Sequence, residues 1–593
     1  MDTRPEQLPQ GLLPLGTSVR SIATLLCWSN GQAVIGKGDS HWGVYKGIKR
    51  KMSDFSATDT PYGKLLTEVT APWGGKVIVW NPSCALWYLC YLMPEFGDFL
   101  RSLKKSHDHK FSVLLNEDVF KVGNVLRPDK GRGIDAVYYT LKDYPHWFRT
   151  SEVGWIPLMY VPERDLEDSG VSSSAVLKLA LQVIYKERVG LGELGVLCQC
   201  TQGEEVHITI ENEFFLLPDE VGLCHMCNIK GANGKLCCLR CKNVMARTDE
   251  ADLVDDPYFF HFKTAKPPQF DLHTKESLFQ SADLLAHAQP ITRIGEFKEL
   301  ETALGLKYEP DALIFDVRWR DHISPDRVLF DSMHCQLANG GNGQYQIKKY
   351  TEACEGAGFS VESIDEFCSE LVGPSRHPKN FLSKRLGDEC LKAFAGEVLD
   401  LVDKLALRIE LVVKPSGRIP EQCQCFEEFV AVVHLLRLGD DVYHRLPALR
   451  HHMQTSVDMF VDLHSDSATV KGVHLPLHIP EQIERHKFHE TTFATERRHK
   501  LGKNRATTKF VKELGNSILP ECVHDFCCSF SRSCKCIPKP YMSPSYVIPP
   551  PPSPGSFSPA FPFPLLLPPH YCFSLCIVQI RAGAPFCFSR SAS

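Results

Sequence analysis

The chain has 593 residues, more than one hydrophobic core usually supports, so we expect two or more folded units or one core with large insertions. With 43% hydrophobic and 23% charged residues, the composition is that of a globular protein. The formal net charge of -5 excludes a uniformly basic coat for nucleic acid, so any contact with DNA has to come from local basic clusters.

The 24 cysteines would indicate disulfides in a small secreted protein, but no apolar signal segment begins at Met1. A reducing compartment is therefore expected. The most apolar stretch near the C-terminus, residues 561–580, is interrupted by prolines, so it is not expected to cross a bilayer. We expect a soluble, intracellular protein that does not bind a membrane.

The first part of the chain mixes glycine-rich turns with short apolar runs at 76–80 and 85–92, and we interpret residues 1–110 as an N-terminal accessory region. The pattern then changes to short apolar segments bounded by turn residues, which is typical of strands. Three such segments follow in quick succession and predict an antiparallel meander: 111–115, 136–141 and 154–161.

A helix is predicted at 172–185, and further strands at 206–210 and 214–217. The resulting order is three strands, a helix and another strand, which is the first half of an RNase H-like fold. In that fold, acidic residues at the ends of neighbouring strands meet around metal ions, although topology alone does not establish function. The sequence thus predicts an α/β protein in which residues 111–245 form the first part of an RNase H-like core with a mixed sheet.

Later parts of the chain change character twice. Long amphipathic runs at 388–413 and 426–438 predict helices, and the composition after Asp525 becomes rich in Pro, Ser and Cys, which is typical of disorder. We therefore expect, in order, a connecting region, a large α-helical insertion, a C-terminal core helix and a disordered low-complexity tail, over residues 246–340, 341–480, 481–526 and 527–593.

Three acidic residues stand where strands end or charged segments begin: Asp118, Asp219 and Glu496. Cleavage of a phosphodiester with two Mg²⁺ ions needs hard oxygen ligands that hold the metals roughly 3.5 to 4 Å apart. Carboxylates on rigid strands supply such ligands. Taken singly, each acid is more simply interpreted as a solvated turn residue or a helix cap. A shared site is predicted because a family resemblance reaches all three acids in order.

That resemblance is carried by short blocks in this order: Thr60–Leu66 (TPYGKLL), Asp118–Asp129 (DVFKVGNVLRPD), Leu217–Glu220 (LPDE), Lys230–Gly234 (KGANG), Cys238–Cys241 (CLRC) and Phe493–Lys500 (FATERRHK). The blocks resemble those of DDE transposases of the RNase H-like superfamily, related to the CACTA and Kyakuja-Dileera-Zisupton groups. The second is similar to the first-aspartate motif, the next three to the second-aspartate block, and the last to the block with the final glutamate. The resemblance spans about residues 60 to 526.

The resemblance implies a transposase that cuts and rejoins DNA, with Asp118, Asp219 and Glu496 as catalytic ligands of Mg²⁺ or Mn²⁺. It also implies that the partner is DNA, at transposon ends and at a target, and that the protein is nuclear. Two positions of the first-aspartate motif depart from the family pattern: Val119 stands where Glu is usual, and Val122 where Pro is usual.

Two Cys-x-x-Cys pairs, Cys224/Cys227 and Cys238/Cys241, are separated by ten residues, a spacing at which four thiolates can converge tetrahedrally on Zn²⁺. Four thiolates leave no open position for water, so a structural zinc that stiffens the loop beside Asp219 is predicted. The other interpretation is a set of free thiols, because neighbouring residues make the choice of ligands ambiguous. Only the second pair is matched in the family.

The segment Phe330–Cys335 (FDSMHC) resembles an Asp-x-Met-His block of the same transposases. Asp331 and His334 in this block either orient the active site or contact DNA, or they cap and anchor the first helix of the insertion. The structural role is favoured, since their three-residue separation suits a local hydrogen-bonded turn. His499, three residues after Glu496, is a further supporting residue.

A run of basic residues with no acid among them follows the last acidic candidate: Arg497, Arg498, Lys500, Lys503, Arg505 and Lys509. Such a density would neutralise several phosphates. If the segment is helical, Glu496, Lys500 and Lys503 share a face, which places a metal-binding carboxylate beside phosphate-binding cations. The alternative, a solvated charged face, does not account for the single sign of the charge.

Three functions therefore compete. The first is a metal-dependent transposase that cleaves DNA and transfers the freed strand. The second is a catalytically inactive or domesticated transposase-derived protein that binds DNA without cleaving it. The third is a zinc-stabilised protein-interaction module, which is least favoured because it requires the basic run to face away from the acids. The oligomeric state is open, and a homo-oligomer fits all three.

Overall fold

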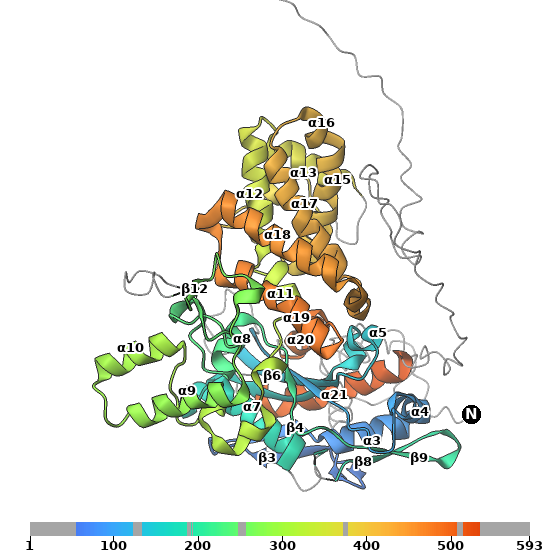
Figure 1. Cartoon of the computed structure of the whole chain (residues 1–593). Coiled ribbons are helices and arrows are strands. Elements are labelled where there is room, and N and C mark those ends of the chain that lie inside the picture. The colour runs from blue at the N-terminus through green and yellow to red at the C-terminus, as the bar shows by residue number, and fades with distance from the viewer. Residues whose placement is uncertain are drawn as a thin grey trace, which may run out of the picture. The chain divides into compact units, whose positions relative to one another are not determined.

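A six-stranded mixed sheet organises the part of the chain that the structure, a computed structural model, describes: residues 55–121, 133–186, 191–192, 194–246, 257–371, 377–506 and 514–533 (Figure 1). The protein is thus α/β, as the sequence predicts. The order across the sheet is β10-β5-β6-β7-β4-β3, with bounds Phe215–Leu216, Val113–Lys121, Gly133–Leu141, Ile156–Pro162, Lys76–Trp80 and Leu66–Thr70.

Strands β5, β6 and β7 form the predicted antiparallel meander, and β10 pairs with β5 in parallel. Every residue of β6 and β7 is buried, so both faces of these strands have to be covered. Helix α7 (Ser173–Leu181), which lies within the predicted helix 172–185, packs on one face. Helix α21 (Leu514–Ser533) packs on the other.

Strand β5 differs from its prediction. The apolar run 111–115 indicated a short strand, but β5 pairs with β6 over its whole length, from Val113 to Lys121. Asp118 therefore lies within the strand instead of just beyond its end. The predicted strand 206–210 is also displaced, because β9 (Glu205–Ile208) forms a separate hairpin with β8 (Val196–Gln199) and does not join the main sheet.

The N-terminal region predicted as accessory contributes directly to the sheet in its described part. The apolar run 76–80 is strand β4, which pairs with β7 and carries β3 at the edge. The second run, 85–92, lies in helix α3 (Pro82–Leu92), which is followed by α4 (Pro94–Leu103). Residues 1–54 lie outside the described part of the chain.

After β10 the chain forms α8 (Glu220–Met226) and then a region with two longer helices, α9 (Lys275–Ala288) and α10 (Ile294–Leu304). It returns to the sheet at Val328, which bridges Leu216 of β10 in parallel.

The helices that follow are α11, α12, α13, α15, α17 and α18, over Ser332–Gln336, Asn342–Gly356, Val361–Glu370, Ala395–Arg408, Pro420–Leu436 and Leu446–His464. The predicted helices 388–413 and 426–438 correspond to α15 with the π-turn that extends it, and to α17. Buried residues between Leu337 and Val433 form a hydrophobic cluster of their own, whereas α18 contributes to the larger core of the sheet.

The chain then returns through α19 (Ile479–His486) and α20 (Phe493–Ala506) to α21. Helix α21 continues to Ser533 and so crosses the boundary predicted at residue 526; residues 534–593 of the predicted tail lie outside the described part of the chain. No helix among the described residues is both long and apolar enough to span a bilayer.

A buried arginine holds this returning segment in place. Arg149, at the end of α5 (His146–Arg149), is 1% exposed. Its guanidinium donates to the Glu490 carboxylate at 2.5 Å and to the Asp440 carboxylate at 2.6 Å. Glu490 lies just before α20, so this charge pair connects the meander to the segment that leads into that helix.

Replacing Arg149 with methionine should lower the free energy of unfolding by about 3 to 5 kcal/mol, because Glu490 is left buried without its charge partner. Urea unfolding followed by tryptophan fluorescence measures the change. Arg164→Met is the matched control, since Arg164 is 54% exposed and forms an ion pair with Asp168 in the next helical turn. Equal effects of the two substitutions would show that the buried pair does not stabilise the fold.

Candidate active site

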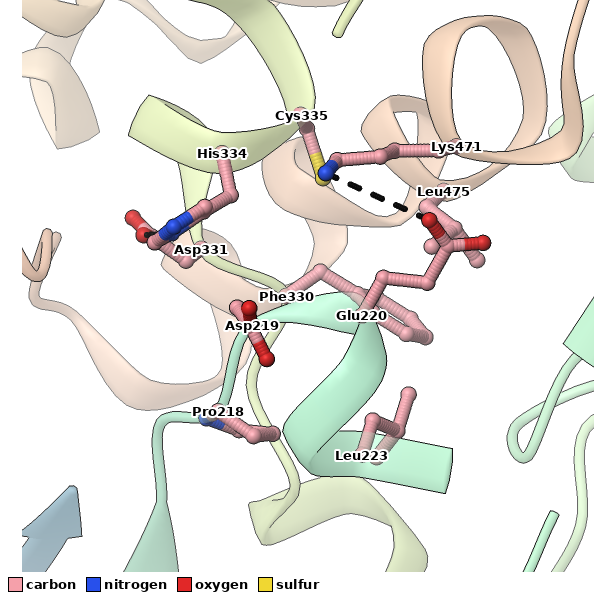
Figure 2. Close-up of a pocket in the computed structure, with 10 residues that line it drawn as sticks. All are labelled: Pro218, Asp219, Glu220, Leu223, Phe330, Asp331, His334, Cys335, Lys471 and Leu475. Atoms are coloured by element: carbon pink, nitrogen blue, oxygen red, sulfur yellow. Dashed lines mark hydrogen bonds and ion pairs between the residues drawn. The ribbon is translucent and has the colours of Figure 1, made fainter. Parts of the chain in front are cut away.

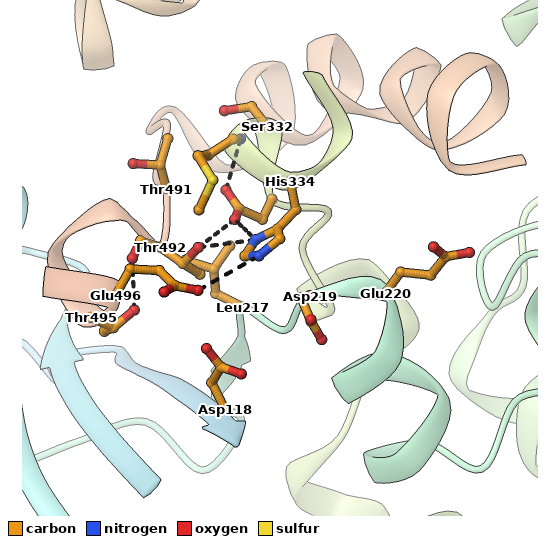
Figure 3. Close-up of polar contacts among 12 residues, drawn as sticks. Asp118, Leu217, Asp219, Glu220, Ser332, His334, Thr491, Thr492, Thr495 and Glu496 are labelled. Carbon is orange, nitrogen blue, oxygen red and sulfur yellow. Dashed lines mark hydrogen bonds and ion pairs between the residues drawn. The ribbon is translucent and has the colours of Figure 1, made fainter. Parts of the chain in front are cut away.

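The three predicted acids come from three separate elements and lie around one space (Figure 3). Asp118 lies in β5, Asp219 caps the N-terminus of α8, and Glu496 lies in the first turn of α20. Strands β10 and β5 are parallel, with Phe215 opposite Leu114. Continuing this register brings Asp219 level with Asp118, so the strand pairing itself places the two aspartates side by side.

Two of the acids form a tight group with a histidine. Asp118, Glu496 and His499 each offer one ligand atom, and these atoms lie within 4.8 Å of one another. The Nδ1 atom of His499 is 3.4 Å from a carboxylate oxygen of Asp118 and 3.8 Å from one of Glu496. Asp219 is not a member of this group; one of its oxygens accepts a hydrogen bond from the Gly222 amide.

The charges at this site repel one another. Burial and the negative charges of Glu496 and Asp219 raise the pKa of the Asp118 carboxyl well above its usual value. Carboxylates held this close favour a bound cation, because a divalent ion removes the repulsion between them. Asp118, Glu496 and His499 could therefore hold a divalent metal ion.

Asp331 and His334 connect the helical segment to these acids. Asp331 caps α11 by accepting from the Met333 amide at 3.0 Å, as the structural interpretation predicted. Its other oxygen lies 2.5 Å from Nδ1 of His334 and accepts from the Thr492 hydroxyl at 2.6 Å. The Nε2 atom of His334 is 3.8 Å from Glu496 (Figure 3), so the same pair also reaches the acidic site.

The Asp331 carboxylate determines the charge of His334. Burial opposes protonation of the imidazole, but the hydrogen bond and the charge of Asp331 raise the pKa of His334 to about 9. The imidazolium therefore persists at neutral pH and offsets part of the negative charge of Glu496 and Asp118.

A small pocket opens between Asp219 and His334 (Figure 2). Lys471, from the segment before α19, reaches into it and lies 4.0 Å from the Glu220 carboxylate. Its ammonium group also donates to the carbonyl of Asn339 at 2.9 Å. The helical part of the chain thus supplies a cation beside the second aspartate.

A second cluster has the composition of a metal centre. Cys238 and Cys241 lie beside His474 and His478, and all four side chains are buried with their ligand atoms within 4.8 Å of one another. The Nε2 atom of His478 is 3.4 Å from the Cys238 sulfur, 3.3 Å from the Cys241 sulfur and 3.4 Å from Nε2 of His474. With metal–ligand bonds of about 2.0 to 2.3 Å, the ligand atoms of a tetrahedral zinc ion lie about 3.3 to 3.8 Å apart, so the cluster could hold such a metal.

The side chains of this cluster lie close enough to shift one another's pKa values. Although burial opposes it, the hydrogen bond from Cys241 and the nearby imidazoles lower the pKa of Cys238 well below its usual value. Burial lowers the pKa of His478, so its imidazole is neutral and can offer a lone pair. Burial and the neighbouring Cys238 sulfur raise the pKa of Cys241, so the two cysteines of the cluster are shifted in opposite directions.

This cluster differs from the four-cysteine set predicted from the sequence. Cys224 and Cys227, at the end of α8, do not belong to it. Burial and the Glu220 and Asp219 carboxylates raise the pKa of Cys224 to about 12, and burial raises that of Cys227 to about 12. Burial also raises the pKa of Cys241, so the positions of the ligand atoms, and not these shifts, separate the two cysteine pairs.

The missing ligands had a signal in the sequence. His474 and His478 have the His-x-x-x-His spacing that pairs with Cys-x-x-Cys in many zinc sites. They were missed because the second cysteine pair lies far from them in the chain, and only the fold brings them together.

The basic run divides into two groups. Lys500 and Lys503 are exposed, and Arg497 is half exposed while it donates to the carbonyl of Thr150. The prediction that all of these cations contact DNA needs correction for Arg498 and Arg505. Both are buried, because their guanidinium groups are used inside the fold.

Arg498 donates to the carbonyl of Glu152 and lies 4.4 Å from the centroid of the Phe526 ring. Arg505 pairs with the Asp525 carboxylate at 2.5 Å. These two residues therefore join α20 to its neighbours, whereas Lys509 lies outside the described part of the chain.

Comparison of the chain with known protein families and with curated proteins finds no match. The functional assignment therefore depends on the geometry of the two side-chain clusters.

Proposed function

We propose that this chain is a DDE transposase-like phosphoryl transferase that cuts and rejoins DNA with the help of divalent metal ions. The observation that supports this most is the meeting of Asp118, Asp219 and Glu496, which lie 101 and 277 residues apart along the chain. The sheet agrees with an RNase H-like core, since three antiparallel strands and a helix precede a strand parallel to the first.

In this proposal each acid has a defined task. Divalent ions, when bound, activate the attacking oxygen of a phosphodiester cleavage and stabilise the leaving oxygen. Asp118 and Glu496 hold one side of the site, and Asp219 holds the other while the α8 cap fixes its orientation. Lys500 and Lys503 extend from the same helix as Glu496 and are exposed, so they are placed to bind the phosphates of the substrate strand.

The departure at Val119 leaves the group of acidic residues intact. Neighbouring residues of a strand point to opposite faces of the sheet, so Val119 faces away from the side on which Asp118 meets Glu496. A glutamate at position 119 would not reach the side of the sheet that carries Asp118, so the valine found there removes no metal ligand. The other departure, Val122, lies outside the described part of the chain.

Nicking of supercoiled DNA by the full-length protein should require Mg²⁺ or Mn²⁺. Asp118→Asn, Asp219→Asn and Glu496→Gln should each reduce the rate by roughly a hundredfold or more, because each removes a ligand of the reacting centre. Asp168→Asn, which changes an exposed acid on α6 (Glu163–Ser169), is the control and should nick normally.

DNA binding without nicking by the folded protein would contradict the transposase proposal and favour the inactive DNA-binding descendant. Nicking that persists unchanged in the three variants would show that other groups carry out the cleavage.

We also propose that the Cys238, Cys241, His474 and His478 cluster binds a structural zinc ion. Two sulfurs and two nitrogens close a tetrahedral coordination sphere and leave no position for water, which suits a structural role. The ion would join the loop after α8 to the segment that leads into α19 and α20, and so would fix the distance between Asp219 and Glu496.

Zinc content measured by plasma mass spectrometry separates this set from the four-cysteine set. The wild type should contain about one zinc per chain, and Cys238→Ser and His478→Asn should lose it. Cys224→Ser and Cys227→Ser should retain it. Loss of zinc from the Cys224 and Cys227 variants, with retention in His478→Asn, would instead restore the four-cysteine site.

A further inference from the structure

His499 stands where a third ligand of the ion between Asp118 and Glu496 would stand. The ring is 2% exposed, and its Nδ1 atom faces both carboxylates at 3.4 and 3.8 Å. Two ligands at right or tetrahedral angles around one metal ion lie about 3.0 to 3.4 Å apart, given metal–ligand bonds of about 2.1 Å. The observed spacing needs only a small adjustment to meet this requirement.

The fold holds this imidazole in place before any ion arrives. Its ring packs against Phe120 at 5.0 Å and against Tyr138 at 5.6 Å between centroids. Glu496 and His499 are three residues apart in α20, so they project from the same side of the helix. The Nε2 atom of His499 has no hydrogen-bond partner among the described residues, so the ring is oriented by this packing and by the carboxylates that face Nδ1.

The other histidine near the site is engaged elsewhere. Nδ1 of His334 contacts Asp331 and the Thr492 hydroxyl, and His334 is not part of the ligand group. It faces Glu496 only through Nε2, at 3.8 Å. His499 is thus the one imidazole among the described residues that is grouped with the two carboxylates.

We infer that His499 is a metal ligand, and that its nitrogen makes the ion held by Asp118 and Glu496 a manganese(II) ion in preference to magnesium. The inference rests on the proposed function. Mg²⁺ prefers oxygen ligands and water in an octahedral arrangement, whereas imidazole nitrogen binds first-row transition ions well. One nitrogen in a site with two carboxylates therefore selects against Mg²⁺, and the site differs in this respect from one built of carboxylates alone.

Equilibrium binding of Mn²⁺ to the full-length, zinc-loaded protein without DNA tests this inference, with competition by Mg²⁺. The electron paramagnetic resonance signal of free Mn²⁺ gives the affinity, and pulsed spectra of bound Mn²⁺ detect a directly coordinated nitrogen. The wild type should bind Mn²⁺ at least about tenfold more tightly than Mg²⁺ and should show nitrogen coupling.

Two substitutions remove the nitrogen in different ways. His499→Phe keeps an aromatic ring between Phe120 and Tyr138, and His499→Gln keeps a polar side chain. Both should lose the nitrogen coupling and weaken Mn²⁺ binding by about tenfold, while Mg²⁺ binding changes by less than about twofold. His444→Asn, which changes an exposed histidine outside the site, should behave as the wild type.

Each alternative result is informative. The inference would be overturned if the wild type showed no nitrogen coupling, a result that does not depend on how the variants fold. It would also be overturned if the coupling persisted in both His499 variants. If Asp118→Asn abolishes Mn²⁺ binding in those circumstances, the acidic site of the proposed function survives while the role of His499 does not. If Asp118→Asn also leaves Mn²⁺ binding unchanged, both proposals fail.

Discussion

The candidate site depends on the close approach of α20 to strand β5. Gly502 permits this approach, because a Cβ atom at that position would lie 2.7 Å from the ring of Phe120. Arg149 stabilises this approach, because its buried guanidinium binds Glu490, which lies just before α20 begins. Without both features, Glu496 and His499 could not reach Asp118, which belongs to a strand formed almost 400 residues earlier in the chain.

A long helical segment separates the two halves of the site, so its ends have to be fixed to the core. The Cys238, Cys241, His474 and His478 cluster does this on one side of the returning chain. The hydrogen bonds of Asp331 with His334 and Thr492 do it on the other. A metal at the cysteine–histidine cluster would therefore not contact the acidic residues. It would fix the position of the segment that carries Glu496.

Apolar runs and short motifs in the sequence predicted several strands, helices and site residues. They did not predict features that depend on contacts with residues far away in the chain. The meander and α7 follow from apolar runs, and the three acids were found through short motifs. The full length of β5 was missed because pairing with β6 extends the strand past its apolar part. Burial of Arg498 and Arg505 cannot be inferred from a basic run, since their partners Glu152 and Asp525 come from other elements.

The most direct test of the acidic metal site is an anomalous difference map from crystals of the protein grown with MnCl₂, recorded at the manganese absorption edge. A peak is expected between Asp118 and Glu496, with carboxylate oxygens at roughly 2.0 to 2.6 Å from it. Manganese peaks elsewhere on the molecule, with none between these two residues, would contradict the claim that the acids form a divalent metal site.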